Sequence, residues 1–209
     1  MTDGPRVPGD QAVINLEGDL VALDPQRRDL QPLYQTWLND VAVMAPLGAA
    51  LRPVTSEAED ATYEQTSTNA QGVWFTVYER ATPRPIGIAG LRDIDDRHRT
   101  AELVIFLGEK GCWGKGYGTE TTRLILDFGF SVLGLENVML RVYRFNERAI
   151  RAYRRAGFRE IGRRREAFRL ADRAYDVILM DYLATEFESP VLRRVFAGAA
   201  GATPESERR

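Results

Sequence analysis

The pattern of apolar and polar positions along the chain predicts a protein built mainly from strands. Apolar runs of strand length, some with apolar residues at every second position, recur and are separated by turn-forming or charged residues. These runs cover residues 13–22 (with a turn at 17–19), 73–78, 85–91, 101–107, 137–143, 158–170 and 174–183. The charged segment 93–99 has the composition of a hairpin end, so we expect the strands on either side of it to be neighbours.

The N-terminal half also contains apolar residues at helical spacing. Asp29 is placed to cap a helix that runs to about Trp37. Either Thr55 or Ser56 is placed to cap a second, short helix over residues 57–66. Between these two helices, prolines and a glycine interrupt the pattern, and we predict a loop from Val41 to Val54.

Two more helices are predicted in the C-terminal half. The first follows residue 117, with an apolar stripe toward the core and a polar face toward solvent: Leu124, Phe128 and Val132 against Glu120, Arg123 and Asp127. The second begins at Asn146, a good capping residue, and ends at Gly157, a residue favoured just after a last helical turn. Strands outnumber helices and hairpins mix with helical connections, so we predict an α+β fold with a mixed sheet covered by helices.

Composition limits the class of protein. Among 209 residues there are 30 acidic and 28 basic ones, so the chain has no general field for a polyanion, and we expect neither nucleic-acid nor membrane partners. A single cysteine cannot form an internal disulfide, and with a single histidine it leaves too few ligands for a zinc site, so no metal is expected. No apolar run reaches the length of a bilayer span. We therefore expect a cytoplasmic protein.

One domain is predicted over residues 11–185. The segments 1–10 and 198–209 are rich in small, proline and charged residues, a composition typical of disorder. Residues 186–197 have apolar positions at partly helical spacing and form a C-terminal extension. This extension either packs back onto the domain or contacts a second copy in a homodimer.

A glycine-rich loop is the strongest chemical signal in the sequence. Gly114, Gly116 and Gly118 alternate after a strand-like run and lead directly into the helix that follows residue 117. Glycine lets the backbone approach a ligand closely, and the start of a helix presents unpaired N–H groups and a partial positive charge. The loop is suited to hold the phosphates of a cofactor. Taken alone, it is also compatible with an ordinary turn between a strand and a helix.

A second motif follows in the helix that begins at Asn146. Tyr153 lies seven residues later, so the capping amide and the phenol share one helix face, with Ile150 between them. Both residues also have purely structural explanations, because Asn146 suits a helix cap and Tyr153 suits a partly buried aromatic position.

Together the two motifs resemble those of the GNAT acetyltransferases. The loop is similar to the acetyl-coenzyme A pyrophosphate signature [Q/R]-x-x-G-x-[G/A], although Trp113 stands where the family has Gln or Arg. The helix is similar to the Asn-x-x-(Ala/Ser)-x-x-x-Tyr-x-x-x-Gly-Phe block. The motifs around Ala101-Glu102-Leu103 and Tyr175-Asp176-Val177 look most like the ribosomal-protein (RimJ/RimL-like) branch, which neighbours the spermidine acetyltransferases. The resemblance covers roughly residues 13–185.

The resemblance implies a sheet whose two central strands splay apart, with acetyl-CoA in the opening. The pantetheine arm would pair with backbone on one strand, glycine-loop amides would hold the pyrophosphate, and Asn146 would hydrogen-bond the pantetheine. Apart from the resemblance, Arg148, Arg151, Arg154 and Arg155 suit the C-terminal half of the second helix electrostatically, and a contact of one of them with the 3′-phosphate is the less favoured alternative. The implied cofactor-binding residues are Ile105, Phe106, Leu107, Trp113, Gly114, Lys115, Gly116, Tyr117, Gly118, Thr119, Asn146, Arg148 and Tyr153.

Acetyl transfer needs a deprotonated amine, a stabilised oxyanion and a protonated leaving thiolate. Glu102 is the candidate base, through a water, and Tyr153 the candidate acid, with a backbone N–H near Ile105 or Phe106 for the oxyanion. Glu102 is equally compatible with a solvated position on a half-exposed strand. The candidate acceptor-binding residues are Trp37, Met44 and Phe75, which core packing would also explain.

The function that follows is transfer of an acetyl group from acetyl-CoA to a primary amine. The acceptor is either a protein N-terminus or a small molecule such as a polyamine, an aminoglycoside or another small amine. The near-neutral chain has no strong field for a polycation, which weakly disfavours polyamines. The alternative from another class is a non-catalytic acyl-CoA-binding sensor that retains the cofactor cleft.

Overall fold

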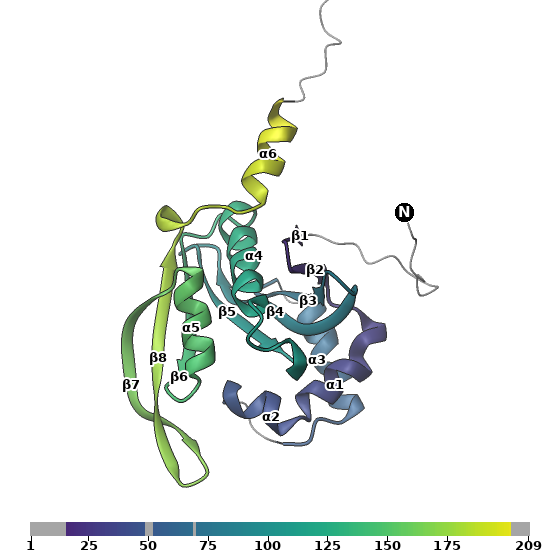
Figure 1. Ribbon diagram of the computed structural model, residues 1–209, viewed down its shortest axis with the longest axis vertical. Helices are drawn as coiled ribbons and strands as arrows, with labels where there is room; N and C mark the ends of the chain where they lie inside the picture. The colour runs from purple at the N-terminus through teal and green to yellow at the C-terminus, as the bar shows by residue number, and fades with distance from the viewer. Residues whose placement is uncertain (1–15, 49–51, 69, 202–209) are drawn as a thin grey trace, which may run out of the picture.

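The computed structural model describes residues 16–48, 52–68 and 70–201. Within them, eight strands form one sheet in the order β1-β2-β3-β4-β5-β6-β8-β7 (Figure 1). The strands are β1 (Leu16–Glu17), β2 (Val21–Pro25), β3 (Val73–Glu79), β4 (Arg84–Asp95), β5 (Thr100–Leu107), β6 (Asn137–Tyr143), β7 (Arg159–Leu170) and β8 (Arg173–Leu183). The strands predicted from the sequence are therefore confirmed, apart from residues 13–15, which lie outside the described residues.

Helices cover both faces of this sheet (Figure 1). The helices are α1 (Gln31–Leu38), α2 (Val41–Met44), α3 (Ser56–Thr68), α4 (Tyr117–Ser131), α5 (Glu147–Ala156) and α6 (Leu192–Gly201). The main core lies between the sheet and α4 and α5, whereas a smaller cluster around Tyr34, Trp37 and Ile88 lies under α1 on the other face. This arrangement confirms the predicted α+β class.

The sheet opens at its centre. Described neighbouring strands are antiparallel except β5 and β6, which run parallel and pair only through Thr100↔Asn137, Ala101↔Val138 and Glu102↔Met139. Beyond Glu102, β5 continues to pair with β4 while β6 continues to pair with β8. The two central strands therefore diverge, as the resemblance implied, and leave a wedge between their C-terminal ends.

Two local predictions near the N-terminus are wrong. The predicted loop 41–54 contains α2, because the Asp40 side chain accepts the Ala42 N–H and caps a helix there, followed by a 3-10 turn over 45–47. Asp29 caps no helix, because its carboxylate is bound by Arg27 and a 3-10 turn over 28–30 precedes α1. The Thr55 cap of α3 is confirmed, since its hydroxyl oxygen accepts the Ala58 N–H.

The polar face predicted for the helix after residue 117 is wrong at one position. Asp127 is completely buried, and one carboxylate oxygen accepts the N–H groups of Val191 and Leu192, both at 2.9 Å. The other oxygen accepts the Ser131 hydroxyl. Asp127 therefore fixes the start of α6 on α4. At the end of α4, Val132 is exposed rather than buried as predicted, since the helix stops at Ser131.

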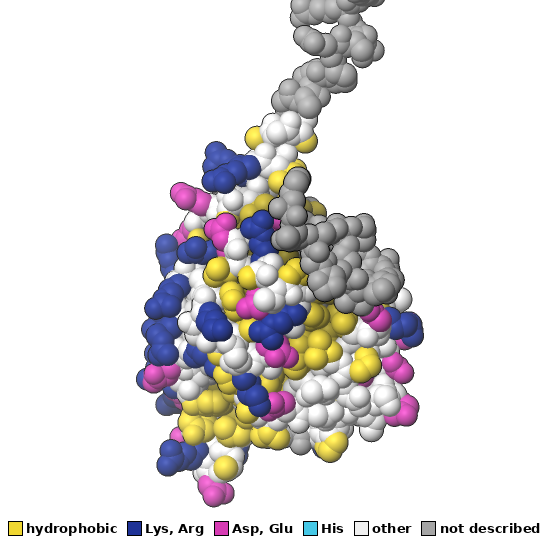
Figure 2. All heavy atoms as spheres, turned by 45° about the vertical axis from the view of Figure 1, so that its right-hand side comes forward, with side chains coloured by type: hydrophobic (Ala, Val, Ile, Leu, Met, Phe, Trp, Pro, Cys, Tyr) yellow, Lys and Arg dark blue, Asp and Glu magenta, His cyan; other side chains and the backbone are white. Residues whose placement is uncertain are grey.

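Helix α6 extends away from the body of the domain (Figure 1). It runs to Gly201, so residues 198–201, where we predicted the start of a disordered tail, are helical. The disorder predicted for 1–10 and 202–209 lies outside the described residues. β7 forms the edge of the sheet opposite β1, and its arginines are exposed. Basic side chains gather on that side of the molecule in Figure 2.

The role of Asp127 predicts a measurable loss of stability. Asp127→Ala leaves two amides and a hydroxyl without their buried acceptor, and we expect the free energy of unfolding to fall by about 1–3 kcal/mol. Urea denaturation measures this change. The matched control is Asp172→Ala in an exposed turn, which should stay within about 0.5 kcal/mol of the unmodified protein. An Asp127→Ala protein as stable as the unmodified one would contradict the assigned role.

Candidate active site

The glycine loop lies at the end of β5 and at the start of α4. Gly114 and Gly116 have φ angles of 77° and 92°, in the left-handed region that favours glycine. Gly116 occupies the N-cap position of α4 without a side-chain cap, so the first helical N–H groups receive no side-chain acceptor from it. A Cβ added at Gly114 or Gly118 would meet no atom within 4 Å, which shows that open space lies beside the loop.

A cleft of about 280 Å³ occupies the wedge between β5 and β6 and reaches this loop. Its wall consists of Val43, Pro46, Leu47, Ile105, Phe106, Leu107, Trp113, Gly114, Gly116, Gly118, Thr119, Asn146, Arg148, Ala149, Arg151, Ala152, Tyr153 and Arg155. Except for Lys115 and Tyr117, each residue named from the sequence as cofactor-binding lies in this wall. The sequence interpretation missed the parts contributed by α2, by the 3-10 turn after it and by Ala149 and Ala152 on α5.

Trp113 links the loop to both neighbouring elements. Its indole N–H donates to the Leu107 carbonyl at 2.9 Å, and the Arg148 guanidinium stacks over its ring at 3.8 Å from the centroid. The residue that departs from the family signature thus holds the loop against the end of β5 and the first turn of α5. Burial lowers the pKa of Arg148.

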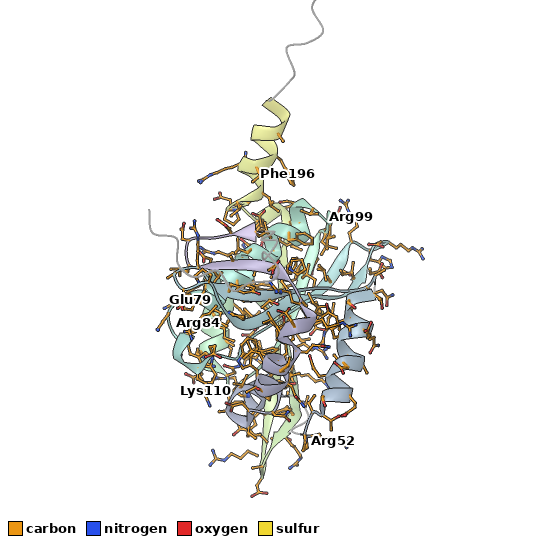
Figure 3. All side chains as sticks on the ribbon, turned by 90° about the vertical axis from the view of Figure 1, so that its right-hand side faces the viewer. Arg52, Glu79, Arg84, Arg99, Lys110 and Phe196 are labelled. Carbon is orange, nitrogen blue, oxygen red and sulfur yellow. The ribbon has the colours of Figure 1, made fainter. Side chains whose placement is uncertain are left out.

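Tyr117 faces away from the cleft. Its hydroxyl donates to Glu79 at 2.7 Å, and this carboxylate also accepts from Thr82 and from Arg84, which lies beside Glu79 in Figure 3. Hydrogen bonds from Thr82, Tyr117 and Arg84, in this order, lower the pKa of Glu79 to about 2. Tyr117 is therefore a support for the start of α4. Lys115 is exposed and, like Tyr117, lies outside the cleft wall, so a cofactor contact at either residue would involve its backbone and not its side chain.

Asn146 caps α5, as predicted. Its side-chain oxygen accepts the Ala149 N–H at 3.2 Å, and its amide nitrogen donates to the Pro46 carbonyl at 3.1 Å. The side chain thereby joins α5 to the turn after α2, across the opening of the wedge. Only one amide hydrogen remains for a ligand.

Tyr153 lies where two cavities meet. It is 9% exposed and lines both the cleft and a second cavity of about 480 Å³ on the side of α2 and α3. Burial raises the pKa of Tyr153 to about 12, so the phenol keeps its proton at neutral pH. A protonated hydroxyl at this junction is able to donate to a group in either cavity.

The second cavity brings one of the three predicted acceptor residues into its wall. Met44 lies there, whereas Phe75 is buried in the main core against Phe128, and Trp37 packs between α1 and the sheet with its N–H donated to Glu109. Strand alternation explains the position of Phe75, because Trp74, its neighbour, is the β3 residue that faces the cavity. The wall comprises Gln26, Leu38, Met44, Pro46, Leu47, Gly48, Glu59, Thr62, Tyr63, Thr66, Trp74, Ile88, Arg92, Glu102, Leu103, Val104, Ile105, Phe106, Arg141, Val142, Tyr143, Asn146 and Tyr153.

Glu102 lies in this cavity wall, and both of its carboxylate oxygens accept hydrogen bonds from arginines. One oxygen accepts from Arg92 and Arg141 and the other from Arg141, all at 2.9 Å. Burial by itself would raise the pKa of Glu102, but the hydrogen bonds from Arg141 and Arg92 outweigh it, and the pKa is lowered. Glu102 is therefore a buried, paired carboxylate, not the solvated surface residue of the alternative interpretation.

Glu59 on α3 differs from Glu102 because no arginine binds its carboxylate in the described chain. It is 6% exposed, and its Oε2 atom is buried without a hydrogen-bond partner in the described chain. Burial, followed by the charge of Asp60, raises the pKa of Glu59 to about 7. We missed this residue in the sequence, although Glu59, Thr62, Tyr63 and Thr66 recur at helical spacing and all line the cavity.

Among the described residues, no group of three or more His, Cys, Asp or Glu side chains is arranged to hold a metal ion. No helix in the described part of the chain has the length and apolar character needed to cross a membrane.

Comparison with known sequences places this geometry in a family. Residues 20–159 match the family described as acetyltransferase (GNAT) domain. Similar curated proteins are an uncharacterized N-acetyltransferase p20 of Bacillus licheniformis, 28% identical over 58% of this chain and 67% of that protein, and two spermidine N(1)-acetyltransferases. The Escherichia coli K12 enzyme is 40% identical over 34% of this chain and 38% of its own, and the Vibrio cholerae enzyme is 32% identical over 53% and 64%. Both spermidine enzymes are thus matched over less than two thirds of their length.

Solved structures show the same fold. A spermidine N-acetyltransferase from Vibrio cholerae in complex with CoA and spermine has a TM-score of 0.75, with 24% identity over 80% of this chain and 98% of that one. A dodecameric structure of the same kind of enzyme has a TM-score of 0.70, with 24% identity over 81% and 96%. None of the relatives named here is described as a ribosomal-protein acetyltransferase, so the narrower branch resemblance finds no support in them. Sequence, sheet topology and cleft together show that this chain belongs to the GNAT acetyltransferase family.

Proposed function

We propose that this protein transfers an acetyl group from acetyl-CoA to a primary amine, and that the acceptor is a small polycation of the polyamine type. The observation that carries the proposal is the position of Tyr153 at the junction between the cleft in the wedge and a second cavity that contains an unpartnered carboxylate, Glu59. One cavity suits an acyl donor, and the other suits a cation.

The cleft has the features that acetyl-CoA would require. The edge of β5 beyond Glu102 faces the wedge without pairing to β6, so backbone groups are available to an extended arm. The glycine loop offers helix-start N–H groups beside open space, which suits a pyrophosphate. When bound, acetyl-CoA supplies an acetyl group activated as a thioester. The residues proposed to hold it are Ile105 to Leu107, Gly114 to Thr119 through their backbone, and Arg148.

Tyr153 is the proposed proton donor to the leaving thiolate. Its raised pKa of about 12 keeps the hydroxyl protonated, and its burial excludes competing water. Because the amine is able to attack a thioester directly, no nucleophilic side chain is needed.

One carboxylate of the second cavity is placed to meet a cationic group of the acceptor. Arg92 and Arg141 both bind Glu102, whereas Glu59 has no basic partner in this wall, so any preference for a cation is local to Glu59. Tyr63, Trp74 and Tyr143 contribute aromatic surface to the same wall, and ring faces attract ammonium groups. The spermidine acetyltransferases among the relatives support this choice over a protein N-terminus.

The lowered pKa of Glu102 argues against the general-base role predicted from the sequence. A carboxylate with both oxygens bound by guanidinium groups accepts a proton poorly. We propose instead that Glu102 positions Arg92 and Arg141 in the acceptor wall.

The variant Tyr153→Phe tests whether Tyr153 donates a proton to the leaving thiolate. We expect Tyr153→Phe to lower kcat by about 10²- to 10⁴-fold, the usual contribution of a general acid, while the Kd for CoA changes little. Thiol release from acetyl-CoA with spermidine as acceptor measures the rate. Tyr175→Phe, which removes a hydroxyl from β8 outside the two cavities, is the control. An unchanged kcat in Tyr153→Phe would refute the acid role. If the unmodified protein binds CoA but turns over none of the amines, the alternative of a non-catalytic acyl-CoA-binding sensor is favoured.

Glu59 predicts a preference for acceptors with a second positive charge. Glu59→Gln should raise KM for spermidine about tenfold, since a charge-assisted hydrogen bond contributes about 1.5–3 kcal/mol, and should leave KM for n-butylamine nearly unchanged. The exposed neighbour Glu57→Gln is the control. Equal changes for both amines would contradict the proposed contact.

The same residue predicts a pH dependence. Because the pKa of Glu59 is raised to about 7, the carboxyl group is neutral below this pH and charged above it. Spermidine affinity should therefore rise between about pH 6 and 8, and Glu59→Gln should flatten this rise.

In the absence of acceptor, the folded state holds a proton that the unfolded state has released, so the stability of the unmodified protein should fall as pH rises toward 7. Urea denaturation across this range gives the sign, and a rising stability would contradict it.

A further inference from the structure

A groove distinct from the second cavity continues from the cofactor cleft along α4 to α6. Its volume is about 800 Å³, and it shares Gly116, Thr119 and Arg155 with the cleft wall. The groove is lined by Glu17, Gly18, Asp19, Leu20, Arg80, Gly116, Thr119, Glu120, Arg123, Leu124, Arg155, Pro190, Val191, Arg194 and Val195. A ligand whose phosphates lie on the glycine loop therefore has a continuous path toward α6.

The free charges of this groove are mostly positive. Arg155 and Arg194 form no ion pair in the described chain, and Arg123 donates only to the Arg155 carbonyl, at 2.7 Å. The acidic members are largely engaged. Glu120 accepts the N–H groups of Asp19 and Leu20, in the turn between β1 and β2, and that of Val21, the first residue of β2. Glu17 is paired with Arg80 at 3.5 Å. Three guanidinium groups are thus available to an anion, with Asp19 as the remaining acid.

Apolar surface lies between these charges. Leu20 is 41% exposed and Val195 is 55% exposed, and the two aliphatic side chains line the same groove from the β1–β2 turn and from α6. Val191 and Leu124 complete the apolar part of the wall. Apolar surface next to guanidinium groups suits a purine nucleotide, in which the base is apolar on its faces and the ribose carries a phosphate.

Helix α6 is held in place over this groove. Asp127 accepts its first N–H groups, and Leu192 is buried in the main core. Phe196 on the same helix (labelled in Figure 3) is 46% exposed and lies outside the groove wall. Like β8, the helix lies beyond residue 159, where the match to the family ends. Its residues Arg194 and Val195 contribute side chains beside the cofactor cleft.

We propose that α6 completes a binding site for the 3′-phosphoadenosine half of CoA, in which Arg194 contacts the 3′-phosphate and Leu20 and Val195 contact the adenine. This inference rests on the proposed use of CoA and goes beyond it, because it assigns a cofactor contact to a helix outside the family match. Arg123 and Arg155 provide the other positive charges of the site. Arg194 contributes to affinity and not to the transfer step.

The test compares two ligands that differ by a single phosphate. Isothermal titration calorimetry measures the Kd of CoA and of 3′-dephospho-CoA for the unmodified protein, Arg194→Ala and Arg194→Lys. We expect Arg194→Ala to weaken CoA binding about tenfold, equivalent to 1.4 kcal/mol, and to leave the Kd of 3′-dephospho-CoA nearly unchanged. Arg194→Lys should restore most of the lost affinity, and the tenfold difference should shrink in 1 M salt. The control is Arg193→Ala, its exposed neighbour on α6 that lies outside the groove wall.

The outcomes separate this inference from the proposed function. If the unmodified protein binds both ligands equally, or if Arg194→Ala weakens both by the same factor, the 3′-phosphate contact is refuted while CoA binding stands. If Arg193→Ala has the same effect as Arg194→Ala, the effect is general electrostatics and the inference fails. If the unmodified protein binds neither ligand, the proposed function itself fails.

Discussion

The short parallel contact between β5 and β6 is the constraint on which the site depends. Three residue pairs join these strands, and then each strand satisfies its backbone on its outer side, β5 with β4 and β6 with β8. Two strands that are each supported from outside are able to separate without leaving the rest of the sheet unpaired. The separation creates a wedge with three boundaries. These are the unpaired edge of β5, the glycine loop that follows β5, and the start of α5, which follows β6. Tyr153 reaches the wedge from α5 because the Asn146 cap fixes where that helix begins.

The acceptor side of the molecule gains its character from how charges are paired rather than from their number. The whole chain is nearly neutral, with 28 basic and 30 acidic residues. Within the second cavity, however, Glu102 is bound by two arginines, whereas the buried Oε2 atom of Glu59 has no hydrogen-bond partner among the described residues. An uncompensated buried carboxyl group is destabilising unless it is protonated or meets a cation. This arrangement is costly for a protein without a ligand and favourable for one that binds an amine, which is why we assign it to the acceptor.

The sequence was informative where local geometry decides the structure. Gly116 and Gly157 adopt left-handed conformations, and Asn146 caps its helix, as their types and spacing predict. It was misleading where partners come from distant segments. Asp127 has the spacing of a solvent-facing residue, and only the return of the chain at 191–192 explains its burial.

The faces of strands and helices were similarly hard to assign. Phe75 and Trp74 are adjacent aromatic residues on β3, and the alternation of the strand does not reveal which of its faces carries the cavity. Glu59 is one carboxylate among several on α3, and its importance depends on which side of that helix packs against the sheet. The two acids of the acceptor wall, Glu59 and Glu102, look alike in the sequence and differ only in their partners.

Hydrogen exchange with and without CoA tests the central claim most directly. If a thioester cofactor lies in the wedge between β5 and β6, CoA should slow the exchange of backbone amides in residues 103–107 and 116–119, while amides of the distant β7–β8 turn at 171–173 should be unaffected. Saturating CoA that leaves the exchange of both segments unchanged, or that protects only residues elsewhere in the chain, would contradict the account.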